Sequence, residues 1–202
     1  MKKEQSVREI LINNTIQLIA EGGFEKATTK AITHVGGHLP DMKMNEVYIY
    51  RLFGSKEQLY DVAFSRLDAE VVFMLRRAME QFEQSDLDLK SKLYELFLRA
   101  WRFLLRNEAH CRCYVRYYYS VYFRGESLCS HNEQFKEFFK WFLPLFKEDA
   151  DVKSIMHSVY TTILDFAVRV YNGDLEDTQT NAEHIFNVLY CMMMTYFKEE
   201  QH

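Results

Sequence analysis

The feature that most constrains the fold is an apolar stripe from Ser55 to about Gln84, which contains no glycine or proline. Its apolar residues recur every three or four positions, the spacing that places side chains on one face of an α-helix. We therefore expect one long helix that links two domains. The stripe consists of Leu59, Val62, Ala63, Leu67, Val71, Met74, Leu75, Ala78 and Phe82.

Helical spacing continues through almost the whole chain of 202 residues, which has only two prolines and seven glycines. No alternating pattern of strand length occurs in the sequence. The hydrophobic content of 48% is enough for one large core or two small ones. The sequence therefore predicts an all-α protein.

The residues just before the stripe have the pattern of a short helix. Met44, Val47 and Ile49 are apolar and are expected to point inward. A helix that presents hydrogen-bonding and aromatic side chains outward suits the major groove of DNA. A surface helix-turn-helix hairpin with no special function would have the same pattern. The side chains expected to point outward are Asn45, Glu46, Tyr48, Tyr50 and Arg51.

Two residues separate the short helix from the long one. Gly54 is expected to end the short helix, and Ser55 is placed to cap the long helix with Gln58 as its capping-box partner. Lys56 falls in the first turn of the long helix. A lysine there opposes the helix dipole, but it would suit a phosphate bound nearby.

A longer helix and a second short helix are expected upstream. Apolar residues at helical spacing from Val7 to Ala20 predict a helix that Gly22-Gly23 ends. Phe24 is expected to turn inward. Thr28 or Thr29 is placed to cap the short helix that follows.

The run from Glu21 to Leu59 resembles the N-terminal domain of the TetR family of transcriptional regulators, and the resemblance covers roughly Ser6 to Phe64. It implies a helix-turn-helix DNA-binding domain over residues 1–66 and a helical effector-binding and dimerisation domain over residues 67–202. The residues that carry the resemblance most specifically are Tyr50, Phe53, Ser55-Lys56-Glu57 and Leu59.

Two positions depart from the family pattern. In the family the recognition helix follows the second helix at once, whereas here residues 38–43 lengthen the turn by six residues. An insertion of this kind costs little free energy, but it can change the angle between the two helices. Val47 replaces the family's usual glycine. Its branched side chain could hold the recognition helix back from the bases or contact a thymine methyl group.

The resemblance also implies which residues contact DNA. Thr28 and Thr29 would bind phosphate through a backbone amide and a hydroxyl group. The residues expected to contact base edges are Asn45, Glu46, Tyr48 and Arg51, and those expected to contact phosphates are Tyr50 and Lys56.

The middle of the chain is unusually aromatic. Helices are expected over Leu87–Arg106, His110–Arg124 and Asn132–Lys147, with Pro144 ending or kinking the last. Aromatic side chains at helical spacing can simply fill a core, whereas the resemblance implies a pocket for an unknown small-molecule effector. Arginines that turn inward would favour an anionic or hydrogen-bonding ligand; otherwise an aromatic or cationic hydrophobe is expected. The candidate pocket residues are Phe97, Trp101, Tyr114, Tyr117, Tyr118, Tyr122, Phe138 and Phe142.

Two further helices are expected over Asp151–Tyr171 and Thr178–Lys198, and their apolar stripes are wider than a monomer of this size needs. Together they would form half of a four-helix bundle that a two-fold partner completes. A homodimer would also place two recognition helices at half-sites about 34 Å apart. The candidate interface residues are Ile155, Val159, Ile163, Phe166, Ile185, Leu189, Met192 and Met193.

The charge and hydropathy of the chain bear on its partners and location. Residues 1–66 hold 9 basic and 8 acidic residues and the remainder hold 16 and 21, so their formal charges are +1 and −5. This balance argues against coating of nucleic acid without sequence preference. The N-terminus is too polar for a signal peptide, and the longest apolar run, Val188–Phe197, is too short to span a bilayer. We expect a cytoplasmic protein without a membrane partner.

Other chemistries find little support. Cys111 and Cys113 could serve metal or redox sensing, but cysteines two apart on a helix point to different sides, and burial as small residues is the simpler interpretation. No cofactor-binding or catalytic motif occurs, so we expect no cofactor and no enzymatic activity.

These features lead to one functional expectation and one alternative. The first is a ligand-responsive transcriptional regulator, by default a repressor, that binds double-stranded operator DNA as a homodimer. Effector binding would shift the population of states through the long helix and so change the spacing of the recognition helices. The alternative is a dimeric helical scaffold that has lost or altered operator binding and acts through a protein partner.

Overall fold

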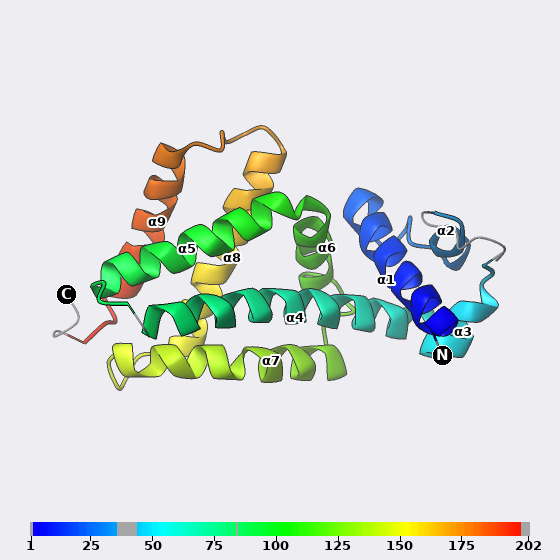
Figure 1. The fold of residues 1–202 in the computed structure, drawn as a ribbon, viewed down its shortest axis with the longest axis horizontal. Coiled ribbons are helices and arrows are strands. Elements are labelled where there is room, and N and C mark those ends of the chain that lie inside the picture. Colours follow the sequence, from blue (N-terminus) through cyan, green and yellow to red (C-terminus); the bar gives the residue numbers. More distant parts are fainter. Residues whose placement is uncertain (1, 36–43, 84, 199–202) are drawn as a thin grey trace. The chain divides into compact units, whose positions relative to one another are not determined.

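The computed structural model describes residues 2–35, 44–83 and 85–198, and within these ranges the regular secondary structure is helical, as expected (Figure 1). One isolated antiparallel bridge joins Phe146 to Phe197. The elements are α1 (Lys2–Gly22), α2 (Thr29–His34), α3 (Val47–Phe53), α4 (Lys56–Glu83), α5 (Leu89–Arg106), α6 (Glu108–Tyr118), α7 (Glu126–Phe142), the 3-10 turn Leu143–Leu145, α8 (Val152–Tyr171) and α9 (Gln179–Met194).

The helices fall into two compact units. The first comprises Met1–Asp68 and Ala109–His131, and the second comprises Ala69–Glu108 and Asn132–His202. The first unit thus contains α6 and the start of α7 as well as the N-terminal helices. The expected division into a DNA-binding domain over residues 1–66 and an effector-binding and dimerisation domain over residues 67–202 stays a prediction. The long helix α4 is continuous over 28 residues and passes from one unit to the other.

The N-terminal helices of the first unit are joined by three side-chain bonds to backbone carbonyl groups. The buried Asn14 amide donates to the Ile32 carbonyl at 2.8 Å and ties α1 to α2. The Arg8 guanidinium donates to the Leu52 carbonyl at 3.0 Å and ties α1 to α3. The Tyr60 hydroxyl, on α4, donates to the Ala27 carbonyl at 2.7 Å. Each of these hydrogen bonds joins two different segments, so together they fix how the helices are arranged relative to one another.

The caps and stops expected in this unit are present. Thr28 is the N-cap of α2, and its hydroxyl accepts a hydrogen bond from the Ala31 amide at 3.1 Å. Gly23 follows α1 with φ of 76°, a conformation that glycine adopts without strain. Phe24 turns inward as expected, and its ring lies 5.2 Å from that of Tyr60 and 4.7 Å from that of Tyr122.

The helix expected over His110–Arg124 ends earlier, at Tyr118. Ser120 explains the difference, because its hydroxyl donates to the Tyr117 carbonyl at 2.7 Å and accepts from the Tyr122 amide at 3.1 Å. Such local bonds offer the backbone an alternative to the helix. Gly125, with φ of 55°, then leads into α7, which begins at Glu126 rather than at Asn132.

In the second unit, α5 packs on both α8 and α9, and α8 packs on α9 (Figure 1). Asp88, Asp151 and Thr178 cap these three helices through their side-chain oxygens. The Tyr171 hydroxyl of α8 donates to the Leu104 carbonyl of α5 at 2.6 Å. The core residues contributed by the three helices are Leu93, Leu96, Phe97, Leu104, Val159, Ile163, Ala167, Ile185, Phe186 and Leu189.

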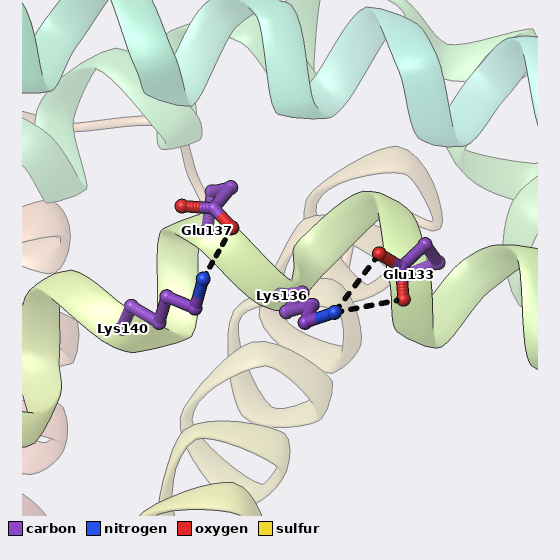
Figure 2. A network of polar contacts seen from close by, with 4 residues as sticks. All are labelled: Glu133, Lys136, Glu137 and Lys140. Carbon is purple, nitrogen blue, oxygen red and sulfur yellow. Dashed lines mark hydrogen bonds and ion pairs between the residues drawn. The ribbon is translucent and has the colours of Figure 1, made fainter.

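Helix α7 ends at Phe142, and Pro144 lies in the 3-10 turn that follows, as expected for a residue that cannot continue a helix. One face of α7 carries two ion pairs between successive turns (Figure 2). Lys136 Nζ lies 3.1 Å from Glu133 Oε1, and Lys140 Nζ lies 2.6 Å from Glu137 Oε1. All four side chains are exposed, so these pairs mark a solvent-facing surface and add little stability.

Candidate nucleic-acid interface

The short helix α3 exposes a different set of residues from the one expected. Met44 and Ile49 are buried as expected, at 7% and 0% exposure, but Val47 is 66% exposed and the inward orientation expected for it is wrong. The helix begins at Val47 rather than at Met44. Its helical period therefore turns Ile49 and Phe53 inward together, and turns Val47 and Tyr50 outward.

The residues that precede α3 are held by local hydrogen bonds. The Asn45 side-chain oxygen accepts a hydrogen bond from the Val47 amide at 3.1 Å. The Thr29 hydroxyl donates to the Glu46 carboxylate, which brings the start of α2 next to the start of α3. Four predicted DNA-contacting positions, Thr28, Thr29, Asn45 and Glu46, therefore lie at the neighbouring starts of these two helices.

Arg51 is exposed, and it contacts side chains of its own unit. Its guanidinium carbon lies 4.7 Å from the centre of the Tyr48 ring, and Nη2 lies 3.6 Å from Glu4 Oε1. Both members of the ion pair are about half exposed, so the pair is weak and can exchange for another anion. Tyr50, on the same side of α3, is 54% exposed.

The junction between α3 and α4 follows the expectation with one difference. Ser55 caps α4, because its hydroxyl accepts a hydrogen bond from the Gln58 amide at 3.0 Å. The Gln58 side chain lies against Gly54 instead of completing a capping box, and a Cβ at position 54 would meet Gln58 Oε1 at 2.2 Å. Gln58 is flexible and could move aside, but Gly54 has φ of 84°, and this backbone conformation is what favours glycine at the position. Lys56 Nζ lies 5.6 Å from the centre of the Tyr60 ring.

Residues 38–43, the insertion identified from the sequence, lie outside the described residues. The consequence expected for the angle between α2 and α3 therefore stays a prediction.

A buried polar cluster in the first unit was not identified from the sequence. We call it the polar junction, since it joins α4 to α6 and α7. The Ser127 hydroxyl donates to Asp61 Oδ1 at 2.9 Å, and the Tyr117 hydroxyl donates to the same oxygen. The residues of the polar junction are Asp61, Asp68, Tyr114, Tyr117, Ser127 and His131.

The second half of the polar junction is an aspartate–histidine pair. His131 Nδ1 lies 3.0 and 3.1 Å from the two carboxylate oxygens of Asp68, which is fully buried. Burial raises the pKa of the Asp68 carboxyl, and the contact with His131 acts in the opposite direction. Asp61 and Asp68 are seven residues apart on the apolar side of α4, a spacing of two turns that could have identified them in the sequence.

The predicted pocket residues are divided between the two units. In the first unit, the Tyr117 ring stacks on Phe64 at 4.3 Å, and burial raises the pKa of its hydroxyl. Tyr114 is buried and its hydroxyl lies 3.5 Å from His131 Nδ1. These contacts favour the core interpretation for both tyrosines. Tyr118 and Tyr122 are half-buried beside other rings.

The other four predicted pocket residues belong to the second unit. Phe97 and Trp101 are buried, and their rings stack at 6.0 Å. The half-buried Phe138 meets the buried Phe142 edge to face at 5.0 Å. The Trp101 indole nitrogen is a buried donor without a hydrogen-bond acceptor in the part of the chain that the structure describes.

The predicted dimer residues differ in exposure. Val159, Ile163, Ile185, Leu189 and Met193 are buried within the single chain, where they contribute to the packing of α8 and α9. Ile155, Phe166 and Met192 remain half-buried and so have surface available for another subunit. The interface itself stays a prediction.

The cysteine sites have the character of packed small residues. Cys111 and Cys113 are both buried, and burial raises the pKa of the Cys113 thiol to about 12, opposed by the nearby Arg116 charge. A thiol with so high a pKa is a poor nucleophile at neutral pH. Across residues 2–35, 44–83 and 85–198, no group of three or more histidine, cysteine or acidic side chains could hold a metal ion. In the same ranges no helix combines the length and the apolar character needed to cross a membrane.

The chain is similar to solved structures of known proteins, but its sequence matches none of the families or curated proteins. No protein-family model matches the chain, and no curated protein matches it. A TetR-family transcription regulator from Marinobacter aquaeolei VT8 has a similar structure, with a TM-score of 0.75, 17% identity and coverage of 95% of this chain and 97% of that one.

Two further solved structures are similar. A protein from Shewanella sp. PV-4 described as a TetR-family transcription regulator has a TM-score of 0.72 and 14% identity over 92% of this chain and 96% of that one. The transcriptional regulator FadR from Bacillus subtilis, solved in complex with stearoyl-CoA, has a TM-score of 0.63 and 18% identity over 90% and 96%. The chain thus has the all-α fold of the TetR-family transcription regulators.

Proposed function

We propose that this protein is a transcription regulator that binds operator DNA through α3 and the starts of α2 and α4. The observation that carries the proposal is the exposed side of α3. Val47, Tyr50 and Arg51 project from a helix whose opposite side, Ile49 and Phe53, is buried. A helix held in this way can enter a major groove without losing its own packing. The fold shared with TetR-family regulators supports the same conclusion.

The contacts divide into base readout and phosphate binding. Arg51 and the residues before α3 would reach base edges, while Thr28, Thr29, Tyr50 and Lys56 would bind phosphates. Arg51 would exchange its weak ion pair with Glu4 for a base or phosphate. Few basic groups are available, so binding should depend strongly on their individual positions and on salt concentration.

A salt series tests the proposal. The full-length protein should prefer the DNA upstream of its own gene over a random duplex, and the logarithm of its affinity should fall linearly with the logarithm of salt concentration. Lys56→Ala should weaken binding to all sequences and reduce the salt slope by about one, whereas Arg51→Ala should relax base preference. The absence of any sequence preference at low salt would exclude operator binding.

We also propose that a small-molecule effector controls DNA binding, by default releasing a repressor. FadR from B. subtilis binds stearoyl-CoA. Here the buried Trp101 donor lacks an acceptor among the described residues, and a ligand carbonyl or carboxylate could supply one. Mass spectrometry of organic extracts from the purified protein should identify a bound compound. Trp101→Phe keeps the ring stacking with Phe97 but removes the donor, so it should weaken retention of that compound.

Homodimerisation is the third part of the proposal. Ile155, Phe166 and Met192 leave apolar surface on α8 and α9, and Val188 on α9 is 47% exposed. A second copy of these helices would cover this surface and complete a four-helix bundle. Analytical ultracentrifugation should give twice the chain mass of 24.2 kDa, and Phe166→Glu should shift the protein towards the monomer. A monomer at micromolar concentration would contradict this part.

The alternative of a scaffold that acts through a protein partner draws on different observations. The chain has a net charge of −4, and the Glu46 carboxylate and Arg51 guanidinium are both engaged by neighbours of the same unit. The salt series separates the two functions, since a scaffold without operator binding would show no preference for any DNA sequence.

A further inference from the structure

The exposed side of α3 carries an apolar residue, Val47. Exposure of an apolar side chain to water is unfavourable, so contact with a partner would stabilise it. Val47 is 66% exposed, and Tyr50 and Arg51 lie three and four residues further on, which places all three on one side of the helix. Val47 makes no contribution to the buried core of its unit. Its side chain is therefore available to a partner of α3.

The polar groups beside Val47 are already engaged. The Asn45 side-chain oxygen accepts a hydrogen bond from the Val47 amide, and the Glu46 carboxylate accepts one from the Thr29 hydroxyl. The Arg51 guanidinium contacts Tyr48 and Glu4. Direct readout by Asn45 or Glu46 would require these bonds to break or be shared. The Val47 side chain makes no hydrogen bond, so its apolar surface can contact a partner without breaking one.

Exposed cations on α3 and on its neighbours in the chain favour DNA as the partner. Lys30 and Arg51 are exposed, and Lys56 is half-exposed at the start of α4. Exposed cations on α2, α3 and the start of α4 can neutralise backbone phosphates. On the major-groove edges of the bases, the group that an aliphatic side chain complements is the 5-methyl group of thymine.

We propose that Val47 is a specificity-determining residue that contacts the 5-methyl group of a thymine in the operator. The inference rests on the proposed operator-binding function and adds to it the base that one position reads. The contact requires a side chain at position 47, and a glycine there would leave the methyl group without a partner.

Deoxyuridine substitution tests the contact directly, since deoxyuridine differs from thymidine only in lacking the 5-methyl group. The full-length protein would first be used to select its preferred duplex from the DNA upstream of its gene. Each thymine of that duplex would then be replaced singly, and affinity measured at one salt concentration. For the wild type, replacement at one position in each half-site should lower affinity about three- to fivefold.

The variant Val47→Ala should bind the unmodified duplex about three- to fivefold more weakly and should lose the sensitivity to deoxyuridine at that position, because the two changes remove the same contact. Val121→Ala is a matched control, since Val121 is 73% exposed in the connection between α6 and α7 and should keep wild-type sensitivity. Circular dichroism would verify that both variants fold.

Two outcomes would overturn the inference, and they can be told apart. If the wild type prefers its operator but tolerates every deoxyuridine replacement, or if Val47→Ala keeps the same sensitivity, then Val47 does not read a thymine although operator binding stands. If the wild type shows no sequence preference, the operator-binding function fails and the inference fails with it.

Discussion

The exposed side of α3 and the polar junction both belong to the first unit, yet they use polar side chains in opposite ways. On α3, the Arg51–Glu4 ion pair is half exposed, and water can replace either partner. In the polar junction, Asp68 is fully buried and His131 is its close partner, so neither side chain can exchange its contact for water. The comparison separates side chains that are free to bind something else from side chains that hold the fold.

The buried contacts of the polar junction also connect three helices of the first unit. The polar junction attaches α6 and the start of α7 to α4, and α4 begins directly after α3. The polar junction therefore holds α6 and the start of α7 against the helix that follows α3.

The largest effect is expected from His131→Ala. Removal of the imidazole takes its closest charged partner from the buried Asp68 carboxyl and leaves it the hydrogen bond to Tyr114, which should lower the free energy of unfolding by about 3–5 kcal/mol. Urea denaturation followed by circular dichroism measures the change. Leu128→Ala, on the same helix and 40% exposed, is the control and should cost far less. An equal effect of both variants would show that the pair does not hold the junction.

A smaller effect is expected from Asn14→Ala in α1. The variant leaves the buried Ile32 carbonyl without its donor, at a cost of about 1–3 kcal/mol. Asn13→Ala changes the neighbouring exposed residue and should leave the midpoint of denaturation nearly unchanged. The pair of variants compares burial directly, since the two residues are identical and adjacent. Similar midpoints for both would mean that the α1–α2 bond contributes nothing to stability.

Asp68 should also give the stability a particular dependence on pH. Burial raises the pKa of its carboxyl in the folded protein, so the folded state binds this proton more tightly than the unfolded chain does. The resulting stabilisation is complete below the unfolded pKa of about 3.9 and is lost as the pH rises through the raised folded value. Asp68→Asn removes this titration. The difference in unfolding free energy between wild type and variant should therefore decrease with rising pH; an increase would contradict the sign.

Much of the fold followed from the sequence because helical spacing and caps are local signals. The continuous stripe predicted α4, Thr28 and Ser55 were recognisable caps, and Pro144 marked the end of α7. The exposure of Val47 was not predictable, because it depends on where α3 begins. The residues just before α3 are held by two hydrogen bonds, one from the Val47 amide to Asn45 and one from the hydroxyl of the distant Thr29 to Glu46.

The polar junction shows a second limit. Its members come from three helices, and the bonded pairs Asp61–Ser127 and Asp68–His131 are 66 and 63 positions apart in the sequence. A carboxylate within an apolar stripe indicates burial, but the sequence does not say which side chain compensates it. Only the packing of α6 and α7 on α4 identifies the partner.

The smallest effect is expected at the start of α2, where two adjacent threonines have different roles. Thr28 caps the helix, whereas Thr29 bonds an exposed carboxylate. Thr28 caps the helix, so Thr28→Ala should cost about 1 kcal/mol of unfolding free energy. Thr29→Val keeps the shape of its side chain and removes the bond to Glu46, whose carboxylate is exposed and can bind water instead, so the cost should stay below about 0.5 kcal/mol. Denaturation midpoints measured side by side decide the matter. A cost at position 29 as large as that at position 28 would mean that the Thr29–Glu46 bond fixes α2 against α3, and the exposed surface would then share the structural role assigned to the polar junction.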